Sequence, residues 1–306
     1  MKFSVGCFGL CIVAILVQQV PSIGIFMMLL LAPFWSVVLI NLGFAALGVE
    51  AFTGAWPRWA IVFPVMWFGG YEFATTISHI EAWDAQRQII AANDRVHLSW
   101  NPQSQDIVVY GGRSGIDQMS DEGLVVNYGV RRVIASSENS LRPSRSTELV
   151  PGPCPQTVVD EADGSKSIYL RAISGGMFTG ERLKSTPDIC TKNSQTQAAA
   201  NGVELHFSPL QKQGGFVEIQ TESILVRNGD ASPMVLTAGS VQALSWLPIP
   251  IAGCFLNDGS SSWDCQYGFG REPTSKLFID AEDVVARALG LTKMPLAKRY
   301  PQLNWN

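Results

Sequence analysis

Two ionisable side chains stand in an otherwise uncharged stretch, and they are the residues best suited to chemistry inside a membrane. Glu72 and His79 are seven residues apart, so a helix would present both near one face. An ionisable residue within a membrane span is a functional candidate by default. The pair would serve a proton or ion path, or a polar contact with a partner helix. The alternative is that Glu72 snorkels to the interface or that the span ends earlier.

Four cysteines outside the apolar N-terminal region indicate the compartment of the chain: Cys154, Cys190, Cys254 and Cys265. An even number in an exported domain predicts two disulfides. The turn-like residues 257–260 favour Cys254 with Cys265, which leaves Cys154 with Cys190. The alternatives are free thiols or a zinc site, but the sequence contains no Cys-x-x-Cys pair.

The glycine-rich motifs do not have the spacing of known catalytic or nucleotide-binding loops. Residues 111–115 lack the Gly-x-Ser-x-Gly order of a nucleophile elbow. Gly175 and Gly180 have phosphate-loop spacing, but Glu181 and Arg182 follow where Lys and Ser or Thr are needed. We therefore predict no catalytic residue, no metal and no cofactor. His206 lies in a strand-like pattern and is expected to be structural.

The charged residues are distributed unevenly, and they divide the chain into a nearly uncharged N-terminal region and a polar remainder. The chain has 306 residues, of which 47% are hydrophobic and 16% are charged, against about 25% charged in globular proteins. Residues 1–80 contain only four charged side chains: Lys2, Glu50, Arg58 and Glu72. The other 226 residues carry 44. This composition predicts a membrane segment followed by a water-soluble one, and it excludes disordered, collagen-like, coiled-coil and basic nucleic-acid-binding chains.

About three transmembrane helices are expected in residues 1–80, at 3–20, 23–48 and 59–80. Residues 3–49 contain no charged residue or histidine, which is long enough for two crossings of about 20 residues each. Polar residues and Pro21 interrupt this run. The first span is alternatively a cleaved signal peptide. The third is alternatively an interfacial or re-entrant segment that ends near residue 70.

The few cations predict the orientation. With three spans, Lys2 and Arg58 lie on one side, which the positive-inside rule makes cytoplasmic. Everything from about residue 81 would then be periplasmic or extracellular, and we expect a bacterial inner membrane with the C-terminal domain in the periplasm. The expected partners are the lipid bilayer and other membrane or periplasmic proteins. Nucleic acid is not expected, because residues 81–306 hold 20 basic and 24 acidic side chains.

The remaining chain is expected to form a helical stalk at 81–94 and an exported β-rich domain at 95–306. Turn signals and β-branched residues predict about eight short strands, which favours a sandwich or partly open barrel. The predicted strands are 95–100, 106–110, 123–135, 167–173, 203–207, 215–226 and 234–237. Residues 136–155 and 184–201 are polar and are predicted to be loops.

Two later elements are also predicted. Asp280 is a good N-cap and Gly290 a good stop for a C-terminal helix. Residues 243–255 are apolar but short and rich in proline, so we expect them to pack in a core rather than to contact the membrane.

These features favour a membrane-anchored, non-enzymatic protein that binds a partner or organises a complex. The alternative is a transport or proton-linked membrane component that uses Glu72 within the third span. A second alternative is an exported hydrolase without a recognisable motif.

Overall fold

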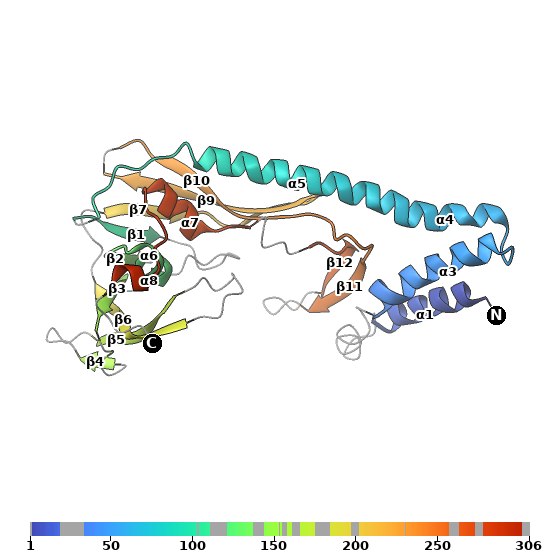
Figure 1. Cartoon of the computed structure of the whole chain (residues 1–306), viewed down its shortest axis with the longest axis horizontal. Helices are drawn as coiled ribbons and strands as arrows, with labels where there is room; N and C mark the ends of the chain where they lie inside the picture. Colours follow the sequence, from blue (N-terminus) through green and yellow to red (C-terminus); the bar gives the residue numbers. More distant parts are fainter. Residues whose placement is uncertain are drawn as a thin grey trace. The chain divides into compact units, whose positions relative to one another are not determined.

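The computed structural model describes residues 2–18, 34–102, 104–110, 121–136, 144–152, 154, 158–160, 166–174, 184–196, 202–229, 231–256, 263–272 and 278–301. The chain divides into two compact units (Figure 1). The helical unit comprises Met1–Trp83, Gly214–Glu218 and Gln242–Pro273. The sheet unit comprises Asp84–Gln213, Ile219–Val241 and Thr274–Asn306. Two segments of the predicted exported domain therefore belong with the N-terminal helices.

The helical unit contains two helices that are long and apolar enough to cross a membrane, Phe34–Phe52 and Arg58–Asn93, and a shorter apolar helix at Phe3–Val17. The last residues of the second long helix belong to the sheet unit. The individual elements are α1 (Phe3–Gln18), η1 (Phe34–Leu39), α3 (Ile40–Phe52), η2 (Arg58–Ile61), α4 (Val62–Val65), η3 (Met66–Gly70) and α5 (Tyr71–Asn93).

Helices α1 and α3 run antiparallel. The Glu50 carboxylate, near the end of α3, accepts hydrogen bonds from the backbone N–H groups of Phe3 at 2.7 Å and Ser4 at 3.3 Å, at the start of α1. A carboxylate at a helix N-terminus pairs backbone donors that have no partner within the helix. Farther along, the rings of Phe8 and Phe44 meet edge to face with centroids 5.0 Å apart.

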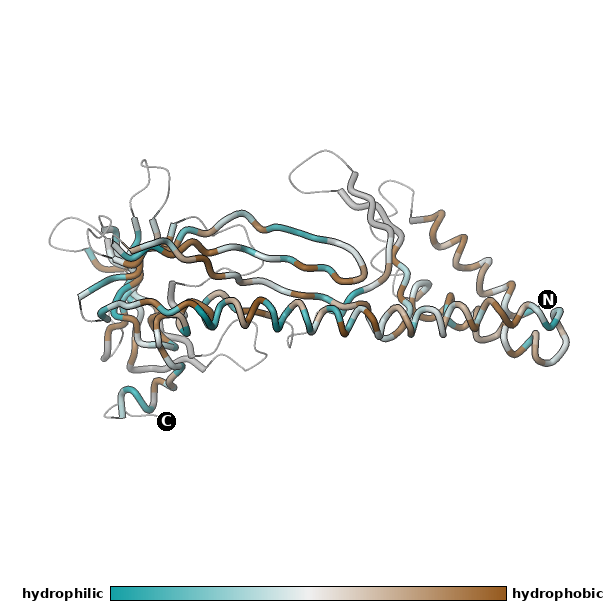
Figure 2. Tube along the Cα trace, turned by 90° about the horizontal axis from the view of Figure 1, so that it is seen from above, coloured by the Kyte–Doolittle hydropathy of each residue, from teal (hydrophilic) through white to brown (hydrophobic). Residues whose placement is uncertain are grey.

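The outer surface of these helices is apolar. The exposed fraction reaches 84% for Phe52, 70% for Phe73 and 67% for Met66. Figure 2 shows predominantly hydrophobic colouring along α1 and α3. A helix of a water-soluble protein buries its apolar face instead.

A two-stranded hairpin completes the helical unit. Strands β11 (Pro250–Leu256) and β12 (Trp263–Phe269) are antiparallel, and their register sets Cys254 opposite Cys265. A cross-strand disulfide requires this backbone arrangement. The side chains of both cysteines lie outside the described part of the structure, so this disulfide stays a prediction.

The sheet unit is built on one open mixed sheet of 11 strands in the order β13-β10-β9-β7-β1-β2-β3-β6-β5-β4, with β8 beside β9. At its centre, β1 is parallel to both β7 and β2. The strands are β1 (Asp106–Tyr110), β2 (Arg132–Ser136), β3 (Ser144–Pro151), β4 (Val158–Asp160), β5 (Lys166–Ser174), β6 (Lys184–Thr196), β7 (Gly202–Phe207), β8 (Gln211–Gln213), β9 (Glu218–Asn228), β10 (Met234–Gln242) and β13 (Phe278–Ile279).

One hydrophobic core lies between a face of this sheet and two helices, α6 (Asp121–Tyr128) and α7 (Ala281–Ala288). Alternate residues of the central strands point into it, such as Ile107 and Val109 of β1 and Val203 and Leu205 of β7. A further short helix, α8, spans Leu296–Arg299.

The open sheet differs from the predicted sandwich or barrel. One cause is that the predicted strand at 123–135 is helix α6 followed by β2. A short apolar run does not distinguish a buried strand from a buried helix. Because a helix lies between them, β1 and β2 are joined as parallel neighbours and not as a hairpin.

The two predicted loops are the second cause of the difference, because they contain paired strands. Strand β3 pairs with β6 over eight residues. Their polar side chains bond across the pair, as where Thr147 Oγ1 donates to Asn193 Oδ1 at 2.7 Å. Cross-strand hydroxyl and amide pairs stabilise a sheet without apolar residues, so hydrophobic periodicity does not reveal these strands.

The predicted C-terminal helix is confirmed as α7. The Asp280 side chain accepts a hydrogen bond from the Glu282 N–H at 2.9 Å, and Gly290 follows the helix with a φ of 71°. The prediction of a strand at 95–100 is wrong. These residues form an irregular segment, although Leu98 is buried in the core and its N–H donates to the Ala288 carbonyl at 2.8 Å.

We predict that Gly239→Ala destabilises the sheet unit by about 2–4 kcal/mol. Gly239 of β10 has a φ of 139°, and an added Cβ would lie 2.0 Å from the Gln220 carbonyl oxygen. Thermal unfolding of the detergent-solubilised chain measures the loss. The control is Gly214→Ala, whose Cβ meets nothing within 4 Å. Equal melting temperatures for the two variants would contradict the close packing of β10 on β9.

Candidate functional site

Glu72 lies in the first turn of α5 with its side chain exposed. Its backbone carbonyl accepts a hydrogen bond from Thr76 Oγ1 at 2.8 Å. Among the described residues, its carboxylate forms no hydrogen bond or ion pair.

His79 has a defined environment within the helical unit. Its Nε2 lies 3.1 Å from the Leu244 carbonyl oxygen, and its ring stacks on Trp246 with centroids 4.2 Å apart. In the described part of the chain, no contact joins His79 to Glu72. Both residues lie on α5, seven positions apart, and His79 fixes residues 244–246 against that helix.

A polar cluster that the sequence did not predict lies where the central parallel strands end. Tyr110 is the last residue of β1, and the register pairs it with His206 of β7. The two rings stack with centroids 4.5 Å apart and an interplanar angle of 9°. His206 Nε2 also lies 3.3 Å from Glu204 Oε2, two residues earlier on the same strand face. We call Tyr110, Glu204 and His206 the strand-end cluster.

The strand-end cluster occupies a topological switch point of the sheet. From β1 the chain continues through α6 to the parallel strand β2 on one side, whereas from β7 it continues through β8 to the antiparallel strand β9 on the other side. In open sheets with parallel strands, ligands bind where neighbouring strands send the chain in opposite directions from their carboxyl ends. The cluster has the topological position of a binding site.

The cluster offers a carboxylate, an imidazole and a phenol. Burial raises the pKa of Tyr110 and the charge of Glu204 raises it further, so the phenol is a neutral hydrogen-bond donor at physiological pH. The side chains of His206 and Glu204 are 29% and 39% exposed, so both are accessible to a partner. The arrangement is suited to binding by hydrogen bonds and charge.

The opposite end of β1 carries an ion-pair cluster. Asp106 is buried, and its carboxylate accepts hydrogen bonds from Arg131 at 2.8 Å and from Arg132. Burial alone would raise the pKa of Asp106, but the two guanidinium groups lower it below its ordinary value. Each carboxylate oxygen thus accepts from one guanidinium group, and the cluster stabilises a buried charge.

A second group of polar side chains is buried between α6 and α7. Asn127 Nδ2 donates to Glu282 Oε1 at 2.8 Å, and the Tyr128 hydroxyl donates to Asp283. Gly123 leaves the space for the Glu282 carboxyl group, because a Cβ there would lie 1.7 Å from Oε2. Burial raises the pKa of Glu282 to about 7.

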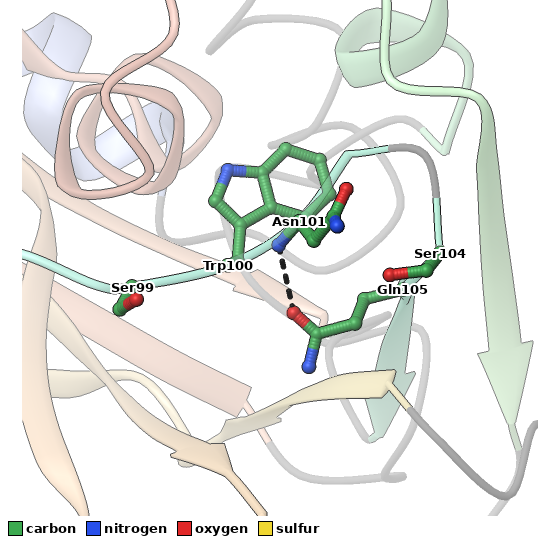
Figure 3. Close-up of a pocket in the computed structure, with 5 residues that line it drawn as sticks. All are labelled: Ser99, Trp100, Asn101, Ser104 and Gln105. Carbon is green, nitrogen blue, oxygen red and sulfur yellow. Dashed lines mark hydrogen bonds between the residues drawn. The ribbon is translucent and has the colours of Figure 1, made fainter.

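A pocket of about 540 Å³ precedes β1 (Figure 3). It is lined by Ser99, Trp100, Asn101, Ser104 and Gln105, and Gln105 Oε1 accepts a hydrogen bond from the Asn101 N–H at 2.8 Å. These five described residues supply hydroxyls, amides and an indole, and none of the five has a titratable side chain. They offer neutral hydrogen bonding.

A cysteine pair lies in the sheet unit. Cys154 and Cys190 lie at disulfide distance, 1.97 Å between sulfurs, and join the end of β3 to β6. Within the described ranges, no group of three or more His, Cys, Asp or Glu side chains could hold a metal ion.

Comparison with known proteins finds no matching family model, no matching curated protein and no matching solved structure.

We predict that Glu282 makes the sheet unit less stable as the pH rises. Its pKa is raised in the folded state, so the unfolded chain releases the proton first and folding stability falls between about pH 4.5 and 7. The expected loss is about 3 kcal/mol. Glu282→Gln keeps the acceptor for Asn127 and should flatten this dependence. Urea unfolding between pH 5 and 8 measures both profiles, and parallel profiles would contradict the prediction.

Proposed function

We propose that the protein is a membrane-anchored, non-enzymatic binding protein, with its helices in the bilayer and its sheet unit in the periplasm or an equivalent oxidising compartment. The observation that carries this proposal is the contrast between the units. The helices expose many large apolar side chains such as Phe52 and Phe73, whereas the central strands of the sheet unit bury most of their apolar residues in a core against α6 and α7. Lipid solvates the first kind of surface and water the second.

The proposed spans are 3–20, 23–48 and 59–80, with Lys2 and Arg58 on the cytoplasmic side. The contacts at the start of α1 support this orientation. Lys2 Nζ lies 3.5 Å from the Trp56 ring centroid, and Trp56 Nε1 donates to Glu50 at 3.1 Å. Lys2 and the α3–η2 turn before Arg58 therefore lie at one end of the helix pair, where tryptophans and cations form an interfacial belt.

The Cys154–Cys190 pair supports an oxidising compartment for the sheet unit, because disulfides persist there and are rare in the cytosol. The strand-end cluster is the proposed contact with a partner protein of the membrane or periplasm. It combines partly exposed polar groups with the position at which such sheets bind ligands.

The proposed anchoring and topology predict that the chain is retained in native membranes and that Cys154 and Cys190 are oxidised there. The chain should stay in membranes washed at alkaline pH. Cys154 and Cys190 should resist alkylation until they are reduced, as measured by mass spectrometry of the two peptides. Release by the wash would contradict the anchoring. Alkylation of both cysteines without reduction would contradict the compartment.

The proposed binding role predicts a site-specific cross-link. A photo-reactive phenylalanine analogue at Tyr110 should give a discrete light-dependent protein adduct in native membranes. Glu204→Lys in the same chain should abolish it by reversing the charge beside His206. The control position is Val235, which is 55% exposed on β10 of the same unit. Identical adducts at both positions, or none at Tyr110, would contradict binding at the strand-end cluster.

A further inference from the structure

Residues 243–250 of the helical unit, which we call the Pro248 segment, are held by side chains of the proposed spans. Asn41 Nδ2 of α3 donates to the Pro248 carbonyl oxygen at 2.9 Å. The Tyr71 hydroxyl of α5 donates to the Ser245 carbonyl oxygen at 2.9 Å. Two helices therefore fix the level of this segment along the spans.

The level of these contacts is inside the hydrocarbon layer. Tyr71 lies 13 residues beyond Arg58, or about 20 Å at 1.5 Å per residue. Asn41 lies nine residues before Glu50, or about 14 Å from the other cytoplasmic anchor. The hydrocarbon core is about 30 Å thick. Both donors thus lie short of the outer boundary, whereas Ser78, which accepts a hydrogen bond from the segment, lies 20 residues beyond Arg58, or about 30 Å, at that boundary.

We infer that the Pro248 segment is a re-entrant element, which enters the outer leaflet and contacts lipid through Trp246 and Leu247. This inference rests on the proposed membrane spans. It differs from the sequence-based expectation that residues 243–255 pack in a core away from lipid.

Several backbone groups of the Pro248 segment are paired within the protein. Non-helical backbone at membrane depth requires partners within the protein. The Leu244 N–H donates to Ser78 Oγ at 2.9 Å, and the Ser245 N–H donates to the Gly270 carbonyl at 3.0 Å. The Ile249 carbonyl accepts from the Gly270 N–H at 2.7 Å. Pro248 and Pro250 have no N–H to pair.

The side chains of the segment follow the pattern of a lipid-facing surface. The polar residue, Ser245, is buried, and its hydroxyl donates to the Leu247 carbonyl at 2.7 Å. Ala243, Leu244 and Pro248 are also buried, whereas the apolar residues Trp246 and Leu247 are 52% and 42% exposed.

Trp246 packs on a helix that exposes large apolar side chains. It stacks on His79 of α5. Phe73 and Ile80 of the same helix are 70% and 59% exposed, and the side chain of Glu72 in the first turn is exposed as well. Tryptophan is enriched at the depth where the acyl chains meet the headgroups. Because the segment and α5 both expose large apolar side chains, lipid is the occupant that fits both.

The inference is tested with a fluorescent label at Leu247→Cys in the full chain, reconstituted into bilayers with brominated acyl chains. Cys7 and Cys11 are replaced by alanine, and the same chain without an introduced cysteine gives the background. Met66→Cys, on a 67% exposed residue of η3, is the positive control. Val235→Cys in the sheet unit is the negative control.

We expect the label at position 247 to lose fluorescence to the brominated lipid to an extent comparable with position 66, and position 235 to lose none. Quenching at 66 but not at 247 would overturn the re-entrant segment and leave the proposed anchoring intact. No quenching at 66 would overturn the anchoring and the inference together.

Discussion

The structure depends on the pairing of backbone polar groups wherever the chain leaves water. At the centre of the sheet, β1 is paired on both sides. At the end of α6, the Arg299 guanidinium donates to the carbonyls of Val126 at 2.9 Å and Asn127 at 3.0 Å, and Gly129, with a φ of 74°, leaves room for it. In residues 243–250, carbonyls of Ser245 and Pro248 accept from Tyr71 and Asn41 of the helices. An unpaired buried carbonyl or N–H would cost about 1–3 kcal/mol at each such place.

The two units pair their backbone groups in different ways, and their outer surfaces differ as a result. The helices satisfy their backbones internally, so they are free to present apolar side chains such as Phe52 and Met66 outward. The sheet needs neighbours for every strand, and it reaches 11 strands by adding polar ones such as β3 and β6 at one side. Its functional groups lie at strand ends, where pairing stops and side chains become accessible.

The sequence predicts elements whose signal is local, and it misses those that depend on distant neighbours. Strand β1 and the α7 cap at Asp280 are as predicted, because β-branched runs and capping residues act within a few positions. Helix α6 was missed because an apolar run of its length suits either secondary structure. The strand-end cluster was missed because Tyr110 and His206 are 96 residues apart in sequence, and only the parallel pairing of β1 with β7 joins them.

The division of the helical unit between both ends of the chain has a consequence for synthesis. Asn41 and Tyr71 are separated from their acceptors, Pro248 and Ser245, by 207 and 174 residues. During translation the helices therefore leave the ribosome long before the chain that pairs their polar side chains, and most of the sheet unit, residues 84–213 and 219–241, is made in between. Long-range contacts of this kind form late and leave a partly folded chain exposed in the meantime. A chain that stops before residue 242 would carry the apolar helices with the Asn41 and Tyr71 donors lacking these acceptors, which is a feature that quality-control proteases and chaperones can recognise.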